Sequence, residues 1–282
     1  MIPLFLSVVC SVLIAFILKI NEVRTGDRIV VLAGNYLMAA GLGFLFLGFD
    51  PTGHLPLGGR VLLFAVLVGV GFAVAFFAYM RSVREVGVAL ATLVARISIV
   101  VPLLASALVY REIPTRLESA GILLTFVTIG VFTRSLRQDR SKTYTTGSLL
   151  ALLTLFLVLG INDFSMKIFR EWRPDGNKEL FLLTLFATAA LFTWTLVVIK
   201  RRKVRLFDLG LGLALGVPNL FASYFLIDAL HQLPGIVVYP LVNVSIIGLT
   251  VLGGILIWRE HINRTGWISL GLAALSIILL SI

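Results

Sequence analysis

The sequence predicts an all-α membrane protein in which ten transmembrane helices form two inverted five-helix repeats. Three observations support this fold class: an apolar composition, ten long apolar runs, and a match between the two halves of the chain. Hydrophobic residues make up 59% of the 282 residues and charged residues only 13%. A soluble domain needs roughly 25% charged residues to cover its surface. We therefore expect this chain to lie in a lipid bilayer.

Each apolar run has close to the ~20 residues that a helix needs to cross the hydrocarbon core. The runs are continuous rather than alternating, which favours helices over barrel strands. The first run has no basic segment before it and is too long for the apolar part of a signal peptide, so we interpret it as a helix. The runs cover residues 2–20, 29–49, 60–80, 86–110, 117–134, 147–169, 179–199, 206–230, 236–258 and 265–282.

Basic residues are distributed unevenly between the two sets of loops. Loops on one side contain 16 Lys and Arg residues and those on the other side contain 7. Because short basic loops are retained in the cytoplasm, the loops at 135–146 and 200–205 are predicted to be cytoplasmic and both termini to lie outside. Membrane topology therefore explains the net charge of +10, and no nucleic-acid partner is expected.

The two halves of the chain match when the sequence is shifted by 148 residues. Apolar matches are common by chance between membrane helices, but a repeated Arg-Glu pair at the same helix end is not. The match predicts a first repeat at 1–134, a polar linker at 135–146 and a second repeat at 147–282. The aligned pairs include Gly87 with Gly235, Arg111–Glu112 with Arg259–Glu260, and Arg116 with Arg264.

An odd number of helices in each repeat places the second repeat in the membrane with the opposite orientation. Inverted repeats of this kind are typical of secondary transporters, in which two related units exchange conformations around a central site. The sequence therefore predicts a secondary-active transporter of a small polar metabolite, with a proton or a counter-substrate as the coupling partner. It predicts neither an enzyme nor a cofactor.

Several motifs resemble the EamA-like branch of the drug/metabolite transporter superfamily. They are Tyr110-Arg111-Glu112, Tyr239-Pro240-Leu241-Val242-Asn243-Val244 and Ile257-Trp258-Arg259-Glu260. The resemblance implies a central cavity surrounded by helices 1, 3, 4, 6, 8 and 9. It also implies a multi-pass protein of the bacterial inner membrane that is a monomer or a weak dimer. The implied substrates range from amino acids to phosphorylated sugars and drugs, so the motifs do not define one.

Arg96 is the charged residue that lies deepest in an apolar run. A charge at the middle of the membrane costs on the order of 2.5–3.5 kcal/mol, so it usually faces a cavity or a partner. One interpretation is a binding group for a carboxylate or a phosphate, through the planar fork of the guanidinium. The other is a structural ion pair with Asp163 or Asp228. Val244 occupies the matching position in the second repeat.

Two aspartates are candidates for coupling transport to an ion. Asp163 follows Asn162, itself a candidate substrate-binding residue, and lies four residues before Lys167, which could neutralise it on the same helix face. Asp228 lies near the end of its run, just before His231, where it could serve as an interfacial cap.

Amides and tyrosines within the apolar runs are further candidates for substrate contacts. Asn219 and Asn35 could equally form interhelical hydrogen bonds. Asn243 follows Pro240, which frees a backbone carbonyl. Tyr79 and Tyr239 could line the cavity or lie at the membrane interface. The Arg-Glu pairs at 111–112 and 259–260 are expected to lock helix hairpins, and Gly212 and Gly216 to allow close helix packing.

Two other functions remain open. A lipid-linked sugar flippase would have a cavity that opens sideways to lipid. A membrane-embedded enzyme or scaffold subunit belongs to another class, and an enzyme would need carboxylates or histidines clustered at one depth. The sequence has no Walker A loop, zinc-ligand spacing or nucleophile elbow, and Cys10 is its single cysteine. No metal site is therefore predicted.

Overall fold

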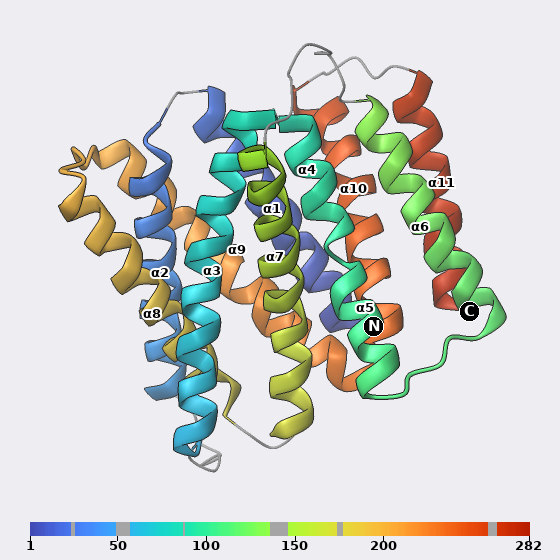
Figure 1. The fold of residues 1–282 in the computed structure, drawn as a ribbon, viewed down its shortest axis with the longest axis horizontal. Coiled ribbons are helices and arrows are strands. Elements are labelled where there is room, and N and C mark those ends of the chain that lie inside the picture. Colours follow the sequence, from blue (N-terminus) through green and yellow to red (C-terminus); the bar gives the residue numbers. More distant parts are fainter. Residues whose placement is uncertain (24–25, 49–56, 87, 136–145, 174–176, 259–263) are drawn as a thin grey trace. The chain divides into compact units, whose positions relative to one another are not determined.

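The structure is a computed structural model that describes residues 1–23, 26–48, 57–86, 88–135, 146–173, 177–258 and 264–282 (Figure 1). Every regular element within these ranges is an α-helix, which confirms the all-α part of the predicted fold class. The helices are α1 (Ile2–Val23), α2 (Arg28–Gly48), α3 (Gly59–Val86), α4 (Val88–Ile97), α5 (Val100–Val109), α6 (Arg116–Ser135), α7 (Thr146–Trp172), α8 (Lys178–Ile199), α9 (Leu206–Gln232), α10 (Gly235–Trp258) and α11 (Arg264–Ser281).

Most of these helices are suited to crossing a membrane. Nine segments of the described chain are long and apolar enough to do so, with parts of α4 and α5 together forming one of them, Ala91–Val109. The nine coincide with nine of the ten expected runs. The tenth, at 117–134, is α6, whose 20 residues make it about 30 Å long at 1.5 Å per residue. The chain is a polytopic membrane protein.

The expected helix at 86–110 is interrupted, and this differs from the prediction of one continuous span. Pro102 has no N–H, so the carbonyl of Ser98 cannot accept the usual hydrogen bond from four residues ahead. Val101 N–H donates to that carbonyl instead, at 2.9 Å. The Ser98 hydroxyl donates to the carbonyl of Ala95 at 2.7 Å. As a result α4 ends just after Arg96, and α5 begins beyond the break.

Tertiary contacts divide the chain into two compact units. Unit 1 contains residues 1–73 and 165–232, and unit 2 contains residues 74–164 and 233–282. The boundaries lie inside α3 and α7, so each unit combines segments from both predicted repeats. The inverted relation between those repeats stays a prediction, and the polar linker between them lies almost entirely outside the described residues.

Close packing of α2 against α9 organises unit 1. A β-carbon at Gly212 would lie 2.2 Å from the carbonyl oxygen of Val31, and one at Gly216 would lie 2.4 Å from that of Asn35. Only glycine leaves room for backbones this close. The packing role predicted for the two glycines is therefore confirmed.

In unit 2, α6 and α11 lie side by side (Figure 1). The hydroxyls of Thr125 and Ser276 are 2.8 Å apart, and Ser276 also donates to the carbonyl of Gly121 at 2.9 Å. Both hydroxyls are fully buried. These bonds join the two helices where no water is available to hydrogen-bond with either group.

Candidate functional site

Arg96 lies in the last turn of α4, directly before the helix break, and its side chain is half-buried. Its Nη1 donates to Oδ1 of Asn243 on α10 at 3.5 Å, which is at the limit for a hydrogen bond. Arg96 also interacts electrostatically with Asp163 on α7. Among the described residues, no carboxylate lies within 4.0 Å of the guanidinium. The cation is therefore oriented but not neutralised by a direct ion pair.

The Asn243 amide has a defined orientation. Its Nδ2 donates to the backbone carbonyl of Tyr239, one turn earlier on α10, at 3.3 Å. That bond leaves Oδ1 facing Arg96. Asn243, predicted as a substrate-binding residue, thus also serves as a direct partner of the buried cation.

Tyr239 joins α10 to α7. Its hydroxyl donates to the backbone carbonyl of Asp163 at 2.9 Å, and the residue is only 3% exposed. The contact brings Tyr239, Asp163 and Asn243 together within unit 2. Because this hydroxyl already bonds the backbone of α7, Tyr239 holds α10 against α7 at the site.

Tyr79, near the end of α3, is the fourth candidate in this group. Its hydroxyl lies 3.3 Å from the hydroxyl of Thr92 on α4, and its ring packs on a small core of Ala78, Ala91 and Leu155. Sequence reasoning missed Thr92. The signal was present, because Thr92 lies four residues before Arg96 and so occupies the same helix face.

Asn162 is buried on α7, with 5% of its surface exposed. It directly precedes Asp163 on the same helix. Lys167 Nζ forms an ion pair with Glu171 at 3.0 Å, one turn further along α7.

The remaining candidates lie in unit 1 and make other contacts. Asn219 on α9 donates to Oδ1 of Asn35 on α2 at 3.1 Å, as expected for an interhelical hydrogen bond. Asp228 accepts from Lys178 Nζ on α8 at 2.5 Å. Asp228, which was expected to cap the end of α9, thus forms an ion pair between α8 and α9.

An aromatic ring, that of Tyr224, also contacts Lys178. The ammonium lies 3.6 Å from the centroid of the Tyr224 ring, which is cation–π geometry. The Tyr224 hydroxyl donates to Glu179 Oε1 at 3.0 Å. Neither Lys178 nor Tyr224 was singled out from the sequence, because the residues lie 46 positions apart in the chain.

The Arg-Glu pair at 111–112 makes a contact far along the chain. Glu112 Oε2 accepts from the backbone N–H of Ile236 at 2.9 Å, at the start of α10. The hairpin-locking role expected of this pair stays a prediction. The second pair, at 259–260, lies outside the described residues. No group of three His, Cys, Asp or Glu side chains in the described chain could hold a metal ion.

Comparisons with known proteins agree with this architecture. The model of the EamA-like transporter family matches residues 1–134, the family that the sequence motifs indicated. An uncharacterised protein from Haemophilus influenzae is 24% identical over 274 residues, which are 95% of this chain and 93% of that protein. A known crystal structure is 15% identical in sequence and has a TM-score of 0.81 to this protein. The match covers 99% of this chain and 94% of the other chain, which shows a shared fold.

Proposed function

Because residues 1–134 belong to the EamA-like transporter family, we propose that this membrane protein is a secondary-active transporter of a small polar anion. The transport cycle is alternating access around a central cavity, as expected of inverted repeats. The location is the inner membrane of a bacterium. The substrate carries a carboxylate or a phosphate, and the coupling partner is a proton or a counter-substrate.

The observation that carries this proposal is the state of Arg96. A guanidinium has five N–H donors in a rigid planar fork, and among the described residues this one donates to one amide oxygen, at 3.5 Å. Leaving a charge inside the membrane without a full partner is costly. The donors that remain suit the two oxygens of a carboxylate or a phosphate, which guanidinium groups bind in bidentate fashion. Asn243 beside it supplies neutral hydrogen bonding.

Asp163 is the better of the two coupling candidates. Asp228 is neutralised by Lys178 at 2.5 Å, whereas the charge that acts on Asp163 within the described residues is that of Arg96. A substrate anion that bonds Arg96 takes away the counter-charge of Asp163. An unpaired carboxylate in an apolar medium is strongly disfavoured, so proton uptake by Asp163 would accompany anion binding. Tyr79 is the other titratable group close to this pair.

A thermal-shift screen of the purified protein tests the substrate class. The panel contains carboxylates, sugar phosphates and inorganic phosphate, with neutral amino acids and organic cations as the contrasting classes. A ligand at 100 times its Kd stabilises the folded state by about 2.7 kcal/mol, so a true ligand raises the melting temperature measurably. We expect anions to do so. Stabilisation by neutral or cationic compounds alone would contradict the proposal.

Uptake into proteoliposomes then tests transport itself. The anion with the largest thermal shift is offered in radiolabelled form, with and without an imposed proton gradient. Accumulation above the equilibrium level shows secondary-active transport. A protein that binds the anion tightly but moves none of it across the bilayer would be a receptor or scaffold rather than a transporter.

A further inference from the structure

The start of α10 is held by a side chain from a loop far away in the sequence. Glu112 Oε2 accepts from Ile236 N–H at 2.9 Å, 124 residues further along the chain. N–H groups in the first turn of a helix have no partner inside the helix. The carbonyl of Pro234 accepts from Val237 and Val238, both at 3.0 Å. The Glu112 carboxylate therefore satisfies a first-turn donor and also complements the positive end of the helix dipole.

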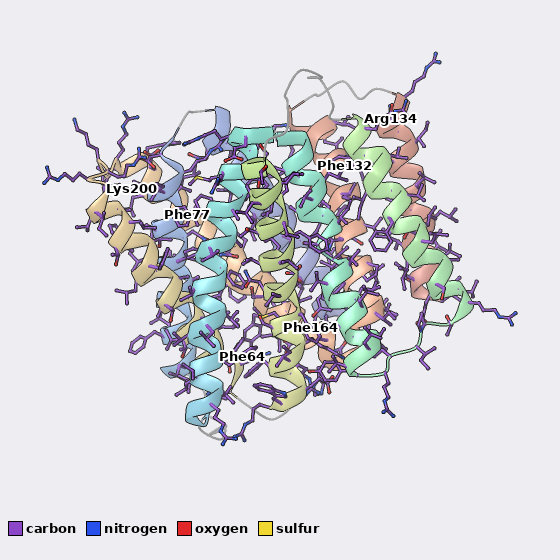
Figure 2. All side chains as sticks on the ribbon, in the orientation of Figure 1. Phe64, Phe77, Phe132, Arg134, Phe164 and Lys200 are labelled. Carbon is purple, nitrogen blue, oxygen red and sulfur yellow. The ribbon has the colours of Figure 1, made fainter. Side chains whose placement is uncertain are left out.

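A sharp turn of the backbone at residues 106–112, called the elbow below, directs Glu112 towards α10. Arg111 has φ 56°, in the left-handed region that a residue with a β-carbon rarely adopts. On either side of it, the N–H groups of Tyr110 and Glu112 both point to the carbonyl of Ser106, at 3.2 and 3.4 Å. The Tyr110 ring contacts the ring of Phe164 on α7, with centroids 6.0 Å apart (Phe164 is labelled in Figure 2). Strain of this kind persists only where surrounding contacts hold it.

The elbow and the first residue of α10 fit together without spare room. A β-carbon at Gly235 would lie 2.6 Å from Ser106 Oγ and 3.4 Å from Glu112 Oε2. Ser106 is fully buried, and its hydroxyl has no hydrogen-bond partner in the described structure. The position of the α10 start is thus set by direct contact with the elbow.

This position matters because α10 carries two residues of the Arg96 site. Tyr239 lies about one turn after Ile236, and Asn243 lies about two turns after it. The bond from Arg96 to Asn243 Oδ1 is already 3.5 Å long, so a shift of α10 by a few tenths of an ångström breaks it. We propose that Glu112 is a positioning residue, which fixes the first turn of α10 and thereby holds Asn243 against Arg96. Its effect on anion binding rests on the proposed function.

The test compares Glu112→Ala and Glu112→Gln with a matched control, Glu118→Ala. Glu118 Oε2 also accepts from a backbone N–H at a helix start, that of Thr115 at 2.6 Å, but Thr115 directly precedes Glu118's own helix, α6. Two measurements are made on each full-length variant. One is the Kd of inorganic phosphate, and the other is amide hydrogen exchange in the peptide that covers residues 235–243.

Glu112→Ala is expected to raise the phosphate Kd about 5-fold, the effect of losing roughly one net hydrogen bond, and to speed exchange in the 235–243 peptide. Glu112→Gln retains an acceptor oxygen and should stay within about 2-fold of wild type. Glu118→Ala should change neither the phosphate Kd nor the exchange of the 235–243 peptide, even if its melting temperature falls as much as that of Glu112→Ala. Equal phosphate binding by wild type and Glu112→Ala, with unchanged exchange, would overturn the proposal.

Gly235→Ala provides a second route if Glu112→Ala fails to fold. Its new methyl group pushes the elbow and α10 apart while Glu112 is retained, so the same loss of phosphate affinity is expected. An unchanged affinity in this variant would count against the positioning role. If the wild-type protein binds no phosphate, the proposed anion specificity fails, and hydrogen exchange alone then decides whether Glu112 holds α10.

Discussion

Each compact unit contains a basic side chain beside an aspartate, but the two charge pairs are built differently. In unit 1, Lys178 Nζ lies 2.5 Å from Asp228 Oδ1 and 3.6 Å from the centroid of the Tyr224 ring. In unit 2, Arg96 interacts electrostatically with Asp163 and donates to Asn243 at 3.5 Å. Among the described residues it has no carboxylate at ion-pair distance. The first cation is neutralised by the protein. The second keeps donors for another acceptor.

The difference separates a structural charge from a functional one. A charge in a membrane helix needs a partner, water or a ligand. Lys178 and Asp228 come from adjacent helices, α8 and α9, and meet that need with each other. Arg96 lies beside a helix break and has no direct ion pair in the described chain. We therefore expect mutations in the first pair to affect stability and mutations around Arg96 to affect binding.

The largest expected effect is that of Arg96→Gln on anion affinity. Loss of charge-assisted hydrogen bonds costs about 1.5–3 kcal/mol, which is roughly a 10- to 150-fold rise in Kd. Isothermal titration of the best anion from the screen measures it. Arg96→Lys should recover only part of the affinity, because an ammonium cannot bind in bidentate fashion.

Arg81→Gln is the matched control, since Arg81 is an exposed arginine that pairs with Glu85 at 2.7 Å in unit 2. It should bind the anion like wild type. A well-folded Arg96→Gln protein with unchanged affinity would remove Arg96 from the binding site. Loss of folding instead of binding would make it a structural residue like Lys178.

Lys178→Met is expected to have an intermediate effect, on stability rather than on binding. It leaves Asp228 partly buried without its counter-charge and removes the cation–π contact. The pair is partly exposed, with side-chain exposures of 20% and 32%, so the cost should be about 2 kcal/mol, between surface and buried pairs. Thermal denaturation in detergent measures this loss.

A double-mutant cycle with Asp228→Asn isolates the pairwise energy. The double variant should recover part of the stability that Lys178→Met loses, because no charge then stays unpaired. The Kd of the anion should remain within about 2-fold of wild type in all three variants. That is well below the tenfold change in Kd that corresponds to about 1.4 kcal/mol. A tenfold loss of affinity would show that the two charge pairs do not differ as described.

The smallest expected effect is that of Asp163→Asn on affinity. Removing this carboxylate frees Arg96 from a competing negative charge, so the anion should bind about 2- to 5-fold more tightly, or roughly 0.5–1 kcal/mol. The same variant should lose proton-driven accumulation while it still exchanges anion across proteoliposomes. Wild-type proton dependence in Asp163→Asn would exclude Asp163 as the coupling group.

Sequence patterns were sufficient for part of the site. Depth within an apolar run identified Arg96, and the structure brings it together with Asn243, Asp163 and Tyr239. The break beside Arg96 was also encoded locally, because Pro102 interrupts an otherwise continuous run. Proline inside a helical pattern is a known signal for a helix end.

Other contacts had no local signal. Lys178 and Asp228 are 50 residues apart, and Glu112 and Ile236 are 124 apart. Helical periodicity relates residues three or four positions apart, so it pairs Asp163 with Lys167. The structure shows an ion pair between Lys167 and Glu171, which has the same spacing, so periodicity alone does not select between the two partners.

By itself, the sequence determined that this is an all-helical membrane protein, where most of its helices lie, and that an arginine within the membrane needs an acceptor. These properties follow from hydrophobic length and from the cost of burying backbone and charge in lipid, which are set segment by segment. Only the tertiary structure decided which charges meet. Within the described residues Arg96 has no direct ion pair, Lys178 is neutralised by Asp228, and Glu112 bonds the start of α10. These outcomes depend on how helices distant in the chain pack against one another.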